Sequence, residues 1–430
     1  MNHNMTLTCD VCEKDIDFRL GMSNRDIQPF SLACPHCSSL INITISRGKG
    51  TEIDGAKQLA DRQYGLFDGR NPFVDMHLDF PVYFGRYIMG MTPFIRAFQM
   101  VDDSIEELGI KDSMEALSLH NSRLNQLNIL HEKRDKIRTI IRLYHGQDKQ
   151  LFNKQVAQFL KNKENKSLKP QDVNATLYQF LSFVFRPFVF HSAITEFIHE
   201  FGEFMMRLAH SRNEALNSFI DRLHETKFLH TVQRDCLKLY PEIYDAELPL
   251  RPAFLLDFIS GYERNKVAAR VSNEDFATYK DLYKDIAEVL GRQLVLVAAL
   301  NNIFHRGNYN EFAKPEHGNA LSSLDKFADK TLSEKFKYLD DCWYNINKDV
   351  VDTGVRNAIA HYTATYDSVS QIITYYPEKE GVRQEQGEVM YFLDFMRMIL
   401  QLFREVHYLH HVIKSLFYYE YLIRSKERNN

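Results

Sequence analysis

TLTCDVCEKDIDFRL, residues 6–20, contains two cysteines separated by two residues, beside alternating apolar and polar side chains. The pattern returns at residues 30–48 as FSLACPHCSSLINITISRG. Successive side chains of a β-strand point to opposite faces, so this alternation indicates strands. Each stretch therefore predicts a Cys-x-x-Cys turn beside β structure, unlike the helical pattern of most of the chain.

Four cysteines make up these two pairs, with 21 residues between the pairs: Cys9, Cys12, Cys34 and Cys37. Each pair supplies two thiolates from one tight turn, and two turns complete a tetrahedral ligand set for Zn2+. Because four thiolates leave no open coordination position, we predict a structural rather than a catalytic zinc ion. His36 lies inside the second pair and is an alternative ligand that the spacing disfavours.

The cysteine pattern resembles zinc ribbons, which implies a small β domain over residues 1–48. Its role stays open between holding nucleic acid, holding a protein trigger and capping the fold. The segment is not notably basic, so a structural or protein-binding role has at least equal weight.

The composition describes a globular chain rich in material for buried cores. Of its 430 residues 44% are hydrophobic, with 31 Phe and 22 Tyr, and the formal net charge is -4. That charge excludes a protein that coats nucleic acid by bulk charge, although it allows a local basic groove. We find no secretory segment at the N-terminus, and the apolar runs 292–304 and 389–403 are too short or too charged to cross a bilayer. We therefore expect a cytoplasmic protein without a membrane partner.

Beyond an irregular stretch at 50–80, apolar residues recur every three to four positions, which predicts helices. The expected helices cover 92–107, 113–146, 149–162, 171–185, 190–226, 230–240, 252–263, 273–304, 319–344, 348–362 and 388–425. The predicted fold class is mainly α, with a small N-terminal β zinc ribbon, a helical middle region and a C-terminal helical bundle that carries a β-hairpin insertion. The expected domains are 1–48, 49–264 and 265–430.

VDTGVRNAIAHYTATYD, residues 351–367, carries the candidate active-site residues. Arginine and histidine occur at similar spacing elsewhere in the chain by chance, so spacing alone says little. Asn357 follows Arg356 directly and lies four residues before His361, on the same face of a helix. Asp352 lies four residues before Arg356 and is placed to pair with it.

The apolar residues of this stretch have helical spacing and predict a face buried in a core: Val351, Val355, Ile359 and Tyr362. The small side chains of Ala358 and Ala360 predict a surface that a ligand can approach closely. On an ideal helix Arg356 and His361 point roughly 140° apart. One such helix is therefore expected to supply half of a site.

The RNAIAHY motif, the β-type insertion after it and the long final helix resemble the HEPN superfamily over residues 265–430. Its members are α-helical bundles with an R-[N/H]-x-x-x-H motif, and many are metal-independent endoribonucleases of bacterial defence and toxin systems. A zinc ribbon combined with such a bundle is also similar to abortive-infection proteins, by analogy alone.

The resemblance implies RNA cleavage by attack of the ribose 2′-OH on the adjacent phosphate, which leaves a 2′,3′-cyclic phosphate and needs no metal. His361 would be the general acid or base, Arg356 would hold phosphate oxygens, and Asn357 would orient the histidine or a phosphate oxygen. Asp352 and Tyr362 would support them.

The resemblance also implies partners. Two motifs of this family face each other across an interface, so a homodimer through the C-terminal bundle is expected, with helix 388–425 as a contact. Region 49–264 would sense a phage-derived or nucleic-acid trigger in anti-phage defence. The alternative from a different class is a non-catalytic module of zinc ribbon and helical bundle that binds nucleic acid or protein.

Three further patterns have ordinary explanations that outweigh the functional ones. His407, His410 and His411 have metal-ligand spacing but suit core packing or an interface better. Glu196-x-x-His199 lacks the second copy that a di-iron bundle needs. The basic runs 131–142 and 161–169 are expected to be solvated helix faces, with an RNA-binding role as the alternative.

Overall fold

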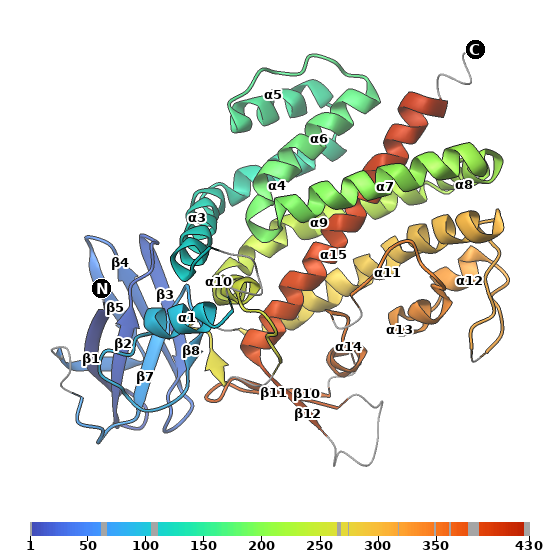
Figure 1. Ribbon diagram of the computed structural model, residues 1–430. Coiled ribbons are helices and arrows are strands. Elements are labelled where there is room, and N and C mark those ends of the chain that lie inside the picture. Colours follow the sequence, from blue (N-terminus) through green and yellow to red (C-terminus); the bar gives the residue numbers. More distant parts are fainter. Residues whose placement is uncertain are drawn as a thin grey trace. The chain divides into compact units, whose positions relative to one another are not determined.

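The computed structural model describes residues 2–61, 67–104, 111–264, 268–273, 275–316, 318–347, 350–360, 363–376 and 387–424. Helices make up 56% of the structure and strands 15%. A β region at the N-terminus and a helical body confirm the prediction of a mainly α fold (Figure 1).

The chain forms two compact units, each built from three separate stretches. Unit 1 comprises Met1–His131, Asp245–Asp281 and Gly354–Leu400. Unit 2 comprises Glu132–Tyr244, Leu282–Thr353 and Gln401–Asn430. These units differ from the predicted division at residues 48 and 264, because both units take residues from the stretch after 264.

Two sheets form the β region of unit 1. The first has the strand order β6-β1-β2-β7, and its members are β1 (Asn2–Cys9), β2 (Asp15–Gly21), β6 (Ala56–Asp61) and β7 (Phe73–His77). The second has the order β3-β4-β5, and its members are β3 (Ile27–Ala33), β4 (Leu40–Ser46) and β5 (Gly50–Asp54). Strand β7 runs parallel to β2, whereas every other pair within these two sheets is antiparallel.

The expectation of an irregular stretch at 50–80 is wrong, because β5, β6 and β7 lie there. Strand β5 is mostly exposed and lacks the apolar alternation that marks a buried strand. Its backbone is held instead by pairing with β4, from Asn42 opposite Asp54 to Ser46 opposite Gly50. Backbone pairing with a neighbouring strand leaves no periodic signal in the side chains, so the pattern of hydrophobic residues could not reveal it.

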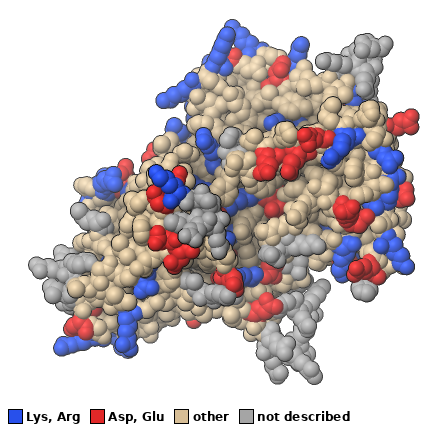
Figure 2. All heavy atoms as spheres, in the orientation of Figure 1, with Lys and Arg blue, Asp and Glu red and all other residues tan. Residues whose placement is uncertain are grey.

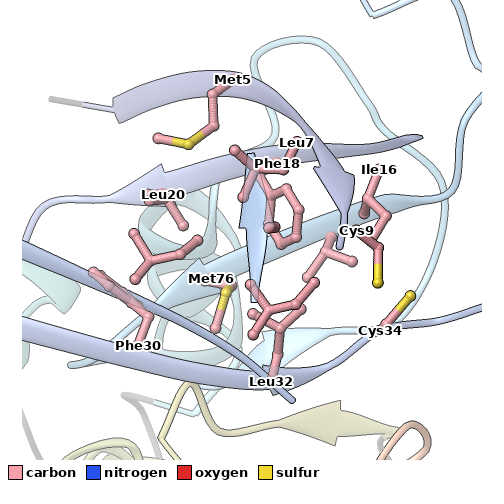
Figure 3. Close-up of a cluster of buried hydrophobic side chains, with 14 of the residues drawn as sticks. Met5, Leu7, Cys9, Ile16, Phe18, Leu20, Phe30, Leu32, Cys34 and Met76 are labelled. Atoms are coloured by element: carbon pink, nitrogen blue, oxygen red, sulfur yellow. The ribbon is translucent and has the colours of Figure 1, made fainter. Parts of the chain in front are cut away.

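Alternate residues of the strands form one core shared by both sheets (Figure 3). Its fully buried members include Met5, Leu7, Ile16, Phe18, Leu20, Ile41, Ile43 and Met76. Cys9 and Cys34 close one end of this core, with 1% and 0% of their surfaces exposed. The two cysteine turns are therefore attached to a rigid, dry support.

Short segments complete unit 1 around the sheets. They are α1 (Pro93–Asp102), α3 (Ser113–His131), α10 (Glu247–Leu255), the 3-10 turn Leu256–Phe258, and the strand pair β8 (Val82–Tyr83) and β9 (Ala269–Arg270). Thr92 begins α1, because its side chain accepts a hydrogen bond from the Ile95 amide and Pro93 occupies the first helical turn. A small antiparallel sheet follows α14 (Thr353–Ala360) and consists of β10 (Ala364–Asp367), β11 (Ile372–Tyr375) and β12 (Glu388–Tyr391).

Unit 2 is helical. Its helices are α4 (Arg134–His145), α5 (Lys149–Leu160), α6 (Pro170–Val184), α7 (His191–Ser211), α8 (Asn213–Glu225), α12 (Leu324–Ala328) and α13 (Leu332–Lys335), together with most of α9 (Phe228–Asp245), α11 (Phe276–Arg306) and α15 (Phe392–Tyr418). A π-helical turn, Tyr419–Arg424, follows α15.

The helix predicted over 319–344 is wrong, because the structure holds only the short helices α12 and α13 there. Ser323 starts α12, and a capping box between Thr331 and Glu334 starts α13. Asp341 has a positive φ of 41°. Local caps and this left-handed residue divide a stretch whose apolar spacing suggested one helix.

Helix α11 is long and apolar enough to cross a membrane by length and composition, with a mean hydropathy of 1.3 over its most apolar window. Because 89% of that window is buried inside the protein, it reads more simply as a core helix. On the face shown in Figure 2, basic and acidic side chains are interspersed.

A buried charge network lies inside unit 1. The guanidinium of Arg251 on α10 has no solvent exposure and contacts two carboxylates, Asp79 at 2.7 Å and Glu247 at 2.5 Å. It also donates to the side-chain oxygens of Asn128 at 2.9 Å and Asn24 at 2.8 Å. Burial raises the pKa of Asp79, but the attraction of Arg251 outweighs it and holds the pKa below its ordinary value.

Arg25 brings a second guanidinium to Glu247. The network therefore holds two arginines and two carboxylates, and its charges balance. Its members come from the β region, from α3 and from α10, so one arginine joins three distant segments of the chain.

We predict that Arg251→Leu lowers the free energy of unfolding by about 3–5 kcal/mol, because two buried carboxylates lose their main counter-charge. Arg70→Leu is the matched control, since the Arg70–Asp68 pair is exposed at 87% and 58% and should change stability by less than about 0.5 kcal/mol. Urea unfolding followed by circular dichroism measures both. Equal effects of the two substitutions would contradict a stabilising role of the network.

Candidate functional site

The sulfur atoms of Cys9, Cys12, Cys34 and Cys37 all lie within 4.8 Å of one another. Two cross pairs, Cys9–Cys37 and Cys12–Cys34, are each 3.8 Å apart. The cluster joins the turn between β1 and β2 to the turn between β3 and β4, and the sulfurs of Cys9 and Cys34 point toward the same place in Figure 3. These four cysteines can hold a structural metal ion, as the sequence predicts.

The two turns have the same backbone geometry. In the first, the Glu13 amide donates to the Cys9 carbonyl at 3.0 Å, and in the second the Ser38 amide donates to the Cys34 carbonyl at 2.8 Å. Glu13 and Ser38 both have left-handed backbones, with φ of 56° and 63°. This repeated turn directs both cysteines of each pair to one side, which brings four sulfurs together.

Ser39 contributes a group that spacing could not identify. Its hydroxyl oxygen lies 3.2 Å from the sulfur of Cys9 and 3.1 Å from that of Cys37. A hydroxyl that donates to thiolates stabilises their charge in a metal site. His36 is not part of the cluster, because its ring nitrogen lies 3.3 Å from the carbonyl oxygen of Asp15.

We predict that Cys34→Ser abolishes the bound metal and lowers the temperature of unfolding, because the site then lacks one of four thiolates on a buried support. Cys342→Ser is the control, since Cys342 lies outside the cluster. Elemental analysis of purified protein should give about one metal ion per chain for the control and close to none for Cys34→Ser. Equal metal content in the two variants, or none in the wild type, would contradict the assignment.

Helix α14 carries Arg356 and Asn357 of the second candidate site. Both residues are partly exposed, as is Ala360, which follows one turn later. The opposite face is packed, with Val355 at 1% and Ile359 at 7% exposure, and Val351 just before the helix is also buried. The helix is thus amphipathic, and its polar side holds the predicted arginine and asparagine.

The prediction that Ala358 opens the surface is wrong, because this residue is fully buried beside Val355 and Ile359. At 100° per residue it returns to the packed side of the helix, so its small size serves close packing. His361 and Tyr362 lie outside the described residues. Asp352 is partly exposed, and its carbonyl oxygen accepts a hydrogen bond of 3.1 Å from the hydroxyl of Tyr283.

The sheet that follows α14 is firmly anchored at its start. The Thr363 amide donates to the Ala358 carbonyl at 2.8 Å, and its hydroxyl donates to the carbonyl of Tyr376 at 3.1 Å. The Gln371 side chain pairs with the backbone of Val271 through two hydrogen bonds, of 2.8 and 2.9 Å. The insertion predicted as a β-hairpin holds three strands instead of two, β10, β11 and β12, and its charged turn at 377–386 lies outside the described residues.

The histidines near the end of α15 are core residues. The hydroxyl of Tyr240 lies 2.7 Å from Nδ1 of His407 and 2.9 Å from Nδ1 of His410, and all three rings are buried. Burial lowers the pKa of His407 to about 4, so the ring is neutral at pH 7. Within the parts of the chain that the structure describes, only the four cysteines form a potential metal-binding group, and His407, His410 and His411 do not.

Comparison of the chain with protein-family models, with curated proteins and with solved structures finds no match. Functional conclusions therefore rest on the residues and their geometry.

Proposed function

We propose that the protein is a metal-independent endoribonuclease in which Arg356, Asn357 and His361 act on RNA, and that its four cysteines hold a structural Zn2+ ion. The observation that carries the first part is the placement of Arg356 and Asn357 on the partly exposed side of α14. The buried side, with Val355, Ala358 and Ile359, fixes the helix in the core and so fixes the direction of the polar pair.

The chemistry needs few groups. A base removes the proton of the ribose 2′-OH, the oxygen attacks the neighbouring phosphorus, and the bond to the 5′-oxygen breaks as that oxygen receives a proton. An imidazole can carry out either proton transfer near neutral pH, which is the role proposed for His361. The guanidinium of Arg356 can hold two phosphate oxygens and offset the charge that develops on them. Asn357 is proposed to orient the phosphate or the histidine.

A second copy of the chain is proposed to complete the site, because α14 is one short helix and presents only part of the group of side chains that the reaction needs. Every residue of α15 from Phe392 to Tyr418 is buried or half-buried. That helix offers no broad exposed face, so the partly exposed side of α14 suits a dimer contact better than the predicted final helix. The biological role proposed is that of a toxin or abortive-infection effector in anti-phage defence.

Sulfur spacing supports zinc as the metal. Zn–S bonds of ~2.3 Å in a tetrahedron place the sulfurs ~3.8 Å apart. The two cross pairs have this separation. A four-thiolate set also suits Zn2+ over the hard cations, which prefer oxygen ligands. Such an ion would link the turns of two hairpins and would take no part in RNA cleavage.

We predict that purified protein cleaves RNA in the presence of EDTA, and that Arg356→Ala and His361→Ala each reduce the rate by about 10²–10⁴-fold. The matched control is Arg138→Ala, because Arg138 also precedes a histidine on a helix but pairs with Asp135 on the surface of α4. Gel analysis of labelled RNA measures the rates, and circular dichroism checks the fold.

Expression of the same variants in bacteria, with cell growth as the measurement, tests the protein in the presence of any natural trigger that the purified protein lacks. Cleavage and toxicity that survive both substitutions would contradict the assignment of the site. RNA that stays whole, together with cells that grow normally, would favour a non-catalytic module that binds nucleic acid or protein.

A further inference from the structure

Unit 2 contains a cavity of about 500 Å³ at the meeting point of several helix ends. The end of α4 and the first turns of α5, α6 and α9 border it, together with Tyr421. Three of its lining residues have positively charged side chains: Lys149, Lys227 and Arg234. His145 and His230 also line it, and burial lowers the pKa of both rings. No carboxylate is among its lining residues within the described parts of the chain.

The carboxylates of neighbouring segments are engaged elsewhere. Asp148 accepts a hydrogen bond from the Leu151 amide at 2.8 Å as the cap of α5, and Asp172 accepts from the hydroxyl of Ser167 at 2.5 Å. Asp235 contacts Arg292. The positive side chains of the cavity are therefore not neutralised from within it, and the cavity favours an anion.

Lys149 is held in position by the protein. Its ammonium donates to the carbonyls of Tyr144 and Gly146, the latter at 2.8 Å, at the end of α4. An ammonium has three N–H donors, so this arrangement leaves one for a ligand. Burial lowers the pKa of Lys149, which an anion beside it would oppose.

The start of α9, a helix of 18 residues, adds to the positive potential, because amide groups at a helix start are not used within the helix and no acidic residue lies in its first turn. Lys227 directly precedes α9, and His230 and Thr231 lie in its first turn. Charged side chains and the start of α9 thus act on the same space.

An aromatic wall accompanies the charges. Tyr144 lines the cavity, and its hydroxyl donates to the side-chain oxygen of Gln233 at 3.2 Å. Gln233 is 3% exposed and bonds in turn to Asn174, whose buried amide nitrogen has no hydrogen-bond partner. Tyrosine faces and buried amides are the groups that proteins use to stack and to read nucleobases.

We propose that this cavity binds a nucleoside phosphate, with the phosphates at Lys149, Lys227 and Arg234 and the base against Tyr144. A volume of about 500 Å³ suits one nucleotide and is too small for a strand of several. The site is separate from the RNA-cleaving site proposed on α14, and its occupancy can be measured without any cleavage.

Isothermal titration calorimetry of the full chain with ATP tests this site, with inorganic pyrophosphate and a short single-stranded RNA as comparison probes. ATP is expected to bind more tightly than pyrophosphate, because only ATP has a base to stack. The double variant Lys227→Glu/Arg234→Glu is expected to weaken ATP binding at least about tenfold. Lys136→Glu/Lys154→Glu is the matched control. Both residues are exposed and lie outside the cavity, and this double variant changes the net charge by the same amount as Lys227→Glu/Arg234→Glu.

Three results would overturn the proposal. The first is that ATP at about 1 mM does not bind, which means a binding free energy weaker than about 4 kcal/mol. The second is that the two double variants lose the same affinity for ATP. The third is that the protein binds the single-stranded RNA but not ATP. If pyrophosphate binds as tightly as ATP, the proposed contact between the base and Tyr144 is contradicted. Thermal unfolding of each variant checks that a loss of ATP affinity does not come from a loss of folded structure.

Discussion

A guanidinium without solvent exposure imposes a strict condition on unit 1. Arg251 can be buried only where carboxylates and amide oxygens replace the water that it loses, and those groups come from the β region, α3 and α10. Packing of the apolar core is non-directional, so many arrangements of these segments would bury similar area. The charge network is directional, and it selects one of them. Arg251 therefore fixes how these segments of unit 1 are arranged, and losing it would also cost stability, because two buried carboxylates would lose a counter-charge.

The segment around Ser272 connects this framework to the element that carries Arg356. The carbonyl of Ser272 accepts a hydrogen bond from the Ser31 amide at 3.0 Å, and its hydroxyl accepts one from the His77 amide at 2.8 Å. Ser31 and His77 belong to the two different sheets. One residue earlier, Val271 pairs with Gln371 of the small sheet that follows α14. Contacts thus run without a break within unit 1. They lead from the cysteine turns through the shared core and the segment around Ser272 to the small sheet. A metal that stiffens the turns would stiffen the base on which α14 is mounted.

Sequence patterns predicted the features that the spacing of residue types encodes. The cysteine spacing led to four sulfurs within 4.8 Å, and the apolar stripe led to the buried face of α14. Features decided by distant partners were not predictable. Strand β5 owes its conformation to pairing with β4, and Ser39 reaches a sulfur 30 positions earlier in the chain. The cavity that gathers Lys149, Lys227 and Arg234 arises from helix ends far apart in sequence, so the charged runs at 131–142 and 161–169 gave no sign of it.

The central claim is that Arg356, Asn357 and His361 cleave RNA without a metal. The chemistry of the RNA ends tests it most directly, because attack by the 2′-OH and attack by a metal-activated water leave different products. Mass spectrometry of cleaved RNA is predicted to find 2′,3′-cyclic phosphate on one fragment and 5′-OH on the other. Fragments that end in 3′-OH and 5′-phosphate would contradict the claim.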